Sequence, residues 1–160
     1  MRGGVLPPAL LFAALAFALA YAPRGSRLPA IVAALIAAFA VAQAPLAPHW
    51  VEYVFFGCWS SVIVTASSIH LRRPIGSRGA LVLGANAGIW AGATIALLGT
   101  TLDLAKATPV LVLVVPAVWL VSTRRGIALK VAGSWLIAIA ALAMVLPIIP
   151  TPGYAPDHME

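Results

Sequence analysis

The stretch LRRPIGSRGALVLGANAGIWAGATIALL, residues 71–98, joins three arginines to an apolar run without a charged side chain from residue 79 onward. A transmembrane helix needs about 20 consecutive apolar residues. Lys and Arg concentrate in the short cytoplasmic loops that border such helices. The stretch therefore predicts a basic cytoplasmic turn followed by a membrane-spanning helix over residues 80–98.

Most other basic residues repeat this arrangement, and the four acids lie elsewhere. The clusters are Arg24 and Arg27; Arg72, Arg73 and Arg78; and Arg124, Arg125 and Lys130. The apolar runs around them predict spans at about residues 5–22, 29–44, 50–69, 80–98, 102–122 and 127–149. We expect an all-α polytopic membrane protein with six transmembrane helices, arranged as three hairpins with basic cytoplasmic turns and both termini outside the cytoplasm. The clustered side chains are also expected to contact lipid head groups.

Proline and capping residues add detail to these predictions. Pro116 should kink the span at 102–122, because its ring removes a backbone bond and clashes one turn back. Thr101 or Asp103 is expected to cap that helix at its beginning. Residues 150–160 are predicted to form a short polar tail outside the cytoplasm.

Two features of the chain leave alternatives open. Ala18-Leu19-Ala20 before Tyr21 fits a signal-peptide cleavage site, but cleavage would leave Arg24 and Arg27 translocated, so we favour an uncleaved first span. The segments PRGSR, residues 23–27, and PIGSR, residues 74–78, resemble each other. They indicate either a repeated helical hairpin or the regular spacing that any series of short hairpins would have.

Composition supports a single membrane domain over residues 1–160. The chain is 62% hydrophobic and 9% charged, whereas soluble domains carry about 25% charged residues. The net charge of +6 is divided among three turns, so the contiguous basic face that nucleic-acid binding needs is not expected. Short loops and abundant Ala, Gly, Pro and Arg favour a bacterial inner membrane.

The predicted span at 80–98 contains the clearest packing motif. Gly84, Gly88 and Gly92, continued by Ala96, recur every four residues and so form a smooth strip on one helix face. The strip predicts a close helix–helix interface, either inside the bundle or with another protein. Asn86 lies off the strip and is expected to form a cross-helix bond or to line a solute path.

The span at 50–69 is the most polar. Cys58, Ser61, Thr65 and Ser68 fall on one helical stripe, which could bond to neighbouring backbone or line a polar path. Glu52 lies near the outer end of the same span, where it is either an interfacial acid or a proton carrier. Gln43, near the outer end of the preceding span, is its candidate partner.

The residues that catalysis or metal binding would need are scarce. Cys58 is the single cysteine. His49 and His70 flank one predicted helix and so lie about 30 Å apart, which prevents them from sharing a metal ion. We therefore expect no metal, no cofactor and no enzymatic activity.

Three functional classes remain. The favoured one is a non-catalytic accessory or assembly subunit that packs against other membrane helices, with a membrane-protein partner or a homo-oligomer in the bilayer. The alternative is a small channel or carrier for a neutral or weakly polar solute. The third is a membrane enzyme acting on a lipid or quinone.

Overall fold

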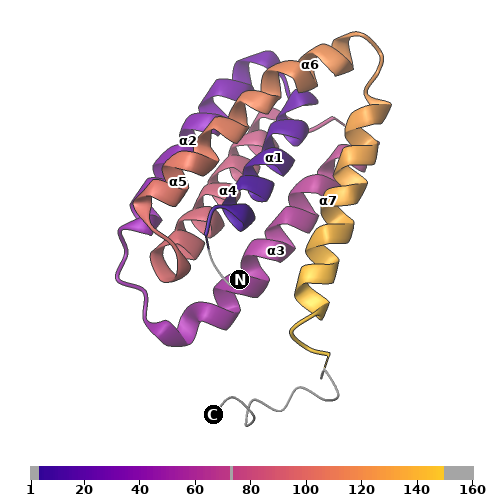
Figure 1. Ribbon diagram of the computed structural model, residues 1–160. Helices are drawn as coiled ribbons and strands as arrows, with labels where there is room; N and C mark the ends of the chain where they lie inside the picture. Colours follow the sequence, from indigo (N-terminus) through magenta and orange to yellow (C-terminus); the bar gives the residue numbers. More distant parts are fainter. Residues whose placement is uncertain (1–3, 73, 150–160) are drawn as a thin grey trace.

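The computed structural model describes residues 4–72 and 74–149, which are helical throughout apart from short connections (Figure 1). The α-helices are α1 (Leu6–Ala20), α2 (Arg24–Ala42), α3 (Val51–Ser67), α4 (Ser77–Leu98), α5 (Thr101–Ala107), α6 (Val114–Ser122) and α7 (Ile127–Val145). Short 3-10 segments are η1 (Pro48–Trp50), η2 (Ser68–His70) and η3 (Thr108–Leu113). Five helical stretches, 24–42, 48–70, 77–98, 101–122 and 127–145, are long and apolar enough to cross a membrane. The predicted all-helical class is therefore confirmed, and the length and hydropathy of these stretches are compatible with a membrane protein.

α1 occupies the middle of the bundle (Figure 1), although its 15 residues make it shorter than each of these five stretches. It packs against α3, α4, η3 and α6 (Figure 1). Its side chains Leu11, Phe12, Leu15 and Leu19 are completely buried. A helix that is apolar on every side has no face suited to water and belongs in a core, which is where α1 lies.

The connections that carry basic residues all lie at one end of the bundle (Figure 1). They join α1 to α2, α3 and η2 to α4, and α6 to α7. The beginning of α1 and the end of α7 lie at the opposite end, together with the α2–α3 and α4–α5 connections (Figure 1). Charge is therefore distributed along the long axis of the bundle, with most Arg residues at one end.

α2 is a peripheral helix that packs chiefly on α4. Its buried face consists of Ala30, Ala34, Ala38 and Ser26. The three alanines lie opposite the glycine strip of α4 in the same order along the chain, so the two helices run parallel. Small residues on both helices allow their backbones to approach closely, which is how helices associate in lipid without a hydrophobic driving force.

In the predicted span at 102–122, the α-helix is interrupted about one turn before Pro116, where a kink was predicted. Residues 101–107 and 114–122 are α-helical, and the intervening η3 has the tighter 3-10 geometry. Pro116 cannot donate to the carbonyl of Val112, and Pro109, near the start of η3, removes a second donor. The irregular region therefore precedes Pro116 and depends on both prolines.

Helix ends differ from the predictions where local bonding decides them. α2 begins at Arg24, before the predicted residue 29, with Pro29 in its second turn. α5 has Thr100 rather than Thr101 as its N-cap, and Asp103 takes part in capping this helix, as predicted, from the third helical position. The carboxylate of Asp103 accepts hydrogen bonds from the Thr100 N–H and Oγ1–H, both at 2.9 Å. α7 ends at Val145, before the predicted residue 149, because Pro147 disfavours helix in the residue that precedes it.

Replacing Gly88 by Ala is expected to destabilise the bundle by about 1–3 kcal/mol, the usual cost of overpacking. An added Cβ would clash with the Ala34 carbonyl oxygen, which belongs to the backbone and cannot rotate away. Gly25→Ala is the matched control, because a Cβ there meets nothing within 4 Å. It should be neutral or stabilising by up to about 1 kcal/mol. SDS titration of each variant in mixed micelles measures this difference, and equal stability of the two variants would contradict the described α2–α4 packing.

Candidate functional site

Arg27, in the first turn of α2, forms hydrogen bonds to the C-terminal end of α1. Its guanidinium donates to the carbonyl oxygens of Leu19 and Ala22 through Nε, at 3.2 and 3.1 Å, and to that of Ala20 through Nη2, at 3.2 Å. The last carbonyls of a helix have no partner within it, and a positive charge there is favourable. Arg27 therefore caps α1 in addition to its predicted contact with lipid head groups.

The connection between α6 and α7 closes with a left-handed residue. Arg124 has φ of 59°. The N–H of Arg125 donates to the Leu120 carbonyl at 2.8 Å, and the N–H of Arg124 donates to that of Val121 at 3.2 Å. This pair of bonds is the Schellman arrangement that ends many helices, usually with glycine in the left-handed position.

The other basic residues of the predicted head-group set lie on the surface. Those that the structure describes are exposed, and Arg73 lies outside the described residues. The exposed side chains are Arg24, Arg72, Arg78, Arg124, Arg125 and Lys130. Their position at one end of the bundle is compatible with head-group contact, which stays a prediction.

The glycine strip of α4 is occupied within the chain. Gly84, Gly88 and Gly92 lie against the backbone carbonyls of Ala30, Ala34 and Ala38, respectively. Ala96, the predicted continuation of the strip, is half-buried near the end of α4. The sequence allowed the strip to pack inside the bundle or against another protein, and in the structure it packs inside the bundle, on α2.

The polar stripe of α3 faces the inside of the bundle. Cys58, Ser61 and Thr65 are buried, and Ser68 is half-buried. Ser68 donates to the carbonyl of Thr65 one turn earlier, at 2.6 Å. Asn86 of α4 donates through Nδ2 to the hydroxyl of Ser61. The stripe and Asn86 thus meet at the α3–α4 contact.

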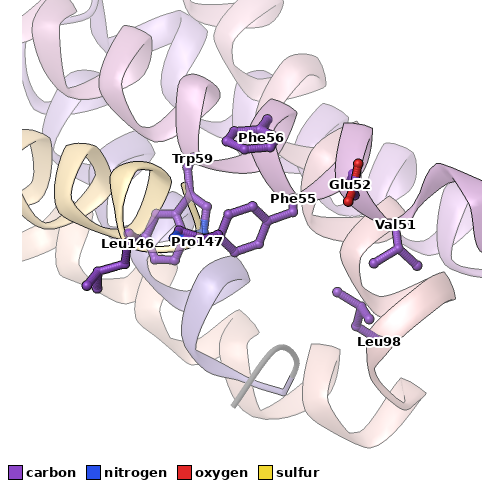
Figure 2. Close-up of a pocket in the computed structure, with 9 residues that line it drawn as sticks. Val51, Glu52, Phe55, Phe56, Trp59, Leu98, Leu146 and Pro147 are labelled. Atoms are coloured by element: carbon purple, nitrogen blue, oxygen red, sulfur yellow. The ribbon is translucent and has the colours of Figure 1, made fainter. Parts of the chain in front are cut away.

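Glu52 and Gln43 are not brought together as a bonded pair. Both side chains are exposed, and the described residues form no hydrogen bond between them. Glu52 lies at the mouth of a cavity of about 320 Å³ between α3, the end of α4 and the end of α7 (Figure 2). The cavity is lined by Val51, Glu52, Phe55, Phe56, Trp59, Leu98, Ala143, Leu146 and Pro147.

The aromatic lining of this cavity is absent from the predicted site residues. Phe55, Phe56 and Trp59 follow Glu52 at spacings of three, four and seven residues, which places all four on one face of α3. That periodicity is visible in the sequence. What the sequence does not show is that Leu98 and Leu146, from distant parts of the chain, complete the cavity.

Within residues 4–72 and 74–149, no group of three or more His, Cys, Asp or Glu side chains could hold a metal ion. Comparison of the chain with family models, curated proteins and solved structures finds no match.

The contact between Ser61 and Asn86 is expected to couple α3 to α4 by about 0.6–1.7 kcal/mol, the range for polar contacts between membrane helices. A double-mutant cycle of Ser61→Ala and Asn86→Ala, read by SDS titration, measures this coupling. Ser134 provides the control, since its exposed hydroxyl bonds to the Lys130 carbonyl on its own helix. A cycle of Ser134→Ala with Asn86→Ala should be additive within about 0.5 kcal/mol. Additivity in both cycles would exclude the cross-helix contribution.

Proposed function

We propose that this protein is a non-catalytic integral membrane subunit that assembles with other membrane proteins. The observation that carries the proposal is the use of the polar stripe in internal contacts. Ser61 and Thr65 are 4% and 0% exposed, and Ser61 accepts the bond from Asn86. Both side chains are enclosed by the bundle, and Ser61 joins α3 to α4, which suits a structural component.

The peripheral helices supply the surfaces that such a subunit would use. Ile36 of α2, Val115 of α6 and Trp135 of α7 are 65%, 66% and 72% exposed. These apolar faces can contact lipid or the helices of another protein. Because membrane helices associate by close packing and occasional polar bonds, broad apolar faces are compatible with a partner.

A channel or carrier for a neutral solute receives less support. Such a protein would direct Ser61 and Thr65 toward a hydrated path, whereas both are buried against neighbouring helices. The cavity at Glu52 lies at one end of the bundle and has a mainly apolar lining (Figure 2). Its lining favours an apolar ligand over a hydrated one.

We further propose six transmembrane segments in a bacterial inner membrane, with the basic connections in the cytoplasm and both termini outside. The proposal is supported by the position of all three basic connections at one end of the bundle (Figure 1). Lys and Arg favour the cytoplasmic side of short loops. In this arrangement the short α1 is the first of the six segments.

Cysteine labelling tests this orientation in intact cells, with Cys58 first replaced by alanine. His49→Cys and Thr101→Cys, both exposed and near the end opposite the basic connections, should react with an impermeant maleimide. Gly25→Cys, Gly76→Cys and Thr123→Cys should react only after the membrane is permeabilised. The reverse pattern, or labelling of both sets in intact cells, would refute the proposed orientation.

Photo-crosslinking in native membranes tests the subunit proposal. Benzoylphenylalanine at Ile36, Val115 or Trp135 should give an adduct of fixed mass with a different protein from at least one position. The same variants in vesicles of pure lipid provide the control and should give none. Native mass spectrometry of the untagged protein should then show a stoichiometric heteromer. A monomer or symmetric homo-oligomer with lipid adducts alone would reject the proposal and favour the carrier.

A further inference from the structure

The cavity that Glu52 lines has the size and lining of a ligand site. Its volume of about 320 Å³ is at the lower end of the range for small-molecule pockets, which is roughly 300–1,000 Å³. Its lining is aromatic and aliphatic, and Glu52 is its single charged residue. In Figure 2, Trp59, Leu146 and Pro147 gather on one side, with Val51 and Leu98 on the other.

The aromatic side chains of α3 form a continuous wall of this cavity. The rings of Phe55 and Phe56 lie 5.5 Å apart, and those of Phe55 and Trp59 lie 6.3 Å apart. Both pairs are in edge-on geometry, with interplanar angles of 84° and 70°. Ring faces attract a cation that lies within about 6 Å of their centres. A wall of three rings beside one carboxylate is therefore suited to a positively charged apolar molecule.

Two polar groups of this wall have no partner among the described residues. The carboxylate of Glu52 forms no hydrogen bond or ion pair there. The indole N–H of Trp59, a residue that is 6% exposed, also has no acceptor. A buried indole N–H usually finds a hydrogen-bond partner. Seven positions separate Glu52 from Trp59, so their Cα atoms lie about 10 Å apart along the axis of α3.

We propose that this cavity binds an amphipathic molecule that carries an ammonium group. The ammonium group lies at Glu52 and against the aromatic faces, and the apolar chain fills the space toward Leu98 and Leu146. A hydrogen-bond acceptor further along the ligand reaches the Trp59 N–H. An aminophospholipid and a soluble long-chain amine share this chemistry. The inference is independent of the proposed subunit function, because it needs no protein partner.

The position of the cavity is consistent with this ligand. The Arg-rich connections lie at the opposite end of the bundle (Figure 1), so their charge does not compete with the ligand for Glu52. Glu52 is exposed at the cavity mouth, while Trp59 is buried. An amphipath can therefore enter with its charged group in the interfacial region and its chain directed into the bundle.

Native mass spectrometry of the purified full chain in a neutral maltoside detergent tests the proposal with two probes. One arm titrates dodecyltrimethylammonium, with dodecanol as the uncharged comparison. The other arm adds equimolar phosphatidylethanolamine and phosphatidylglycerol. We expect one bound cation and little dodecanol. If phosphatidylethanolamine is retained and blocks the binding of dodecyltrimethylammonium, the ligand is a lipid. If dodecyltrimethylammonium binds and the protein shows no preference between the two lipids, the ligand is a soluble amine.

Three variants complete the test. Glu52→Gln should raise the apparent Kd of dodecyltrimethylammonium at least tenfold. Trp59→Phe, which keeps a ring and removes the N–H, should weaken the retention of phosphatidylethanolamine severalfold, because the oxygens of that lipid can accept the bond, and should leave dodecyltrimethylammonium, which has no acceptor, nearly unchanged. Asp103→Asn, which neutralises another acid at the same end, should leave the Kd of dodecyltrimethylammonium unchanged. The helical circular dichroism of each variant verifies folding. Equal affinity of the Glu52→Gln variant, equal binding of dodecanol, or no adduct in either arm would overturn the proposal.

Discussion

The close approach of α2 to α4 is the contact on which the outer part of the bundle depends. In lipid, helices gain little from burying apolar side chains, so their association depends on packing and polar bonds. Gly84, Gly88 and Gly92 leave room for the backbone of α2, which packs extensively on α4 alone. Any side chain on this strip separates the helices, and α2 has no second large interface to retain it.

The inner part of the bundle uses a different arrangement. α1 packs in the core through side chains larger than those at the α2–α4 contact. Three hydrogen bonds from Arg27 cap its C-terminal end. α3 joins α4 through the contact of Ser61 with Asn86. The hydroxyl of Ser61 and the last carbonyls of α1 are thus paired at a helix contact and a helix end, whereas the buried hydroxyl of Thr65 has no partner among the described residues. At the cavity near Glu52, two further polar groups have no partner among the described residues.

Sequence patterns predicted the helical class and the approximate helix positions, because the length of an apolar run and the placement of arginines depend directly on the membrane. They also located the glycine strip. They could not choose its partner, since the matching alanines at Ala30, Ala34 and Ala38 lie in an alanine-rich helix with many similar faces. The start of α5 was missed by one residue, because Thr100 rather than Thr101 is the N-cap, although Asp103 was identified as a capping residue. The cavity was missed because Leu98 and Leu146 reach Trp59 only after folding.

The central position of α1 has a consequence for how the chain is made. α1 leaves the ribosome before the elements that surround it, α3, α4, η3 and α6. Its immediate successor, α2, packs chiefly elsewhere. Because synthesis proceeds from the N-terminus toward the C-terminus, α1 lacks most of its native contacts until α6 has emerged. A helix that is translated before its neighbours is therefore among the last of this bundle to gain them.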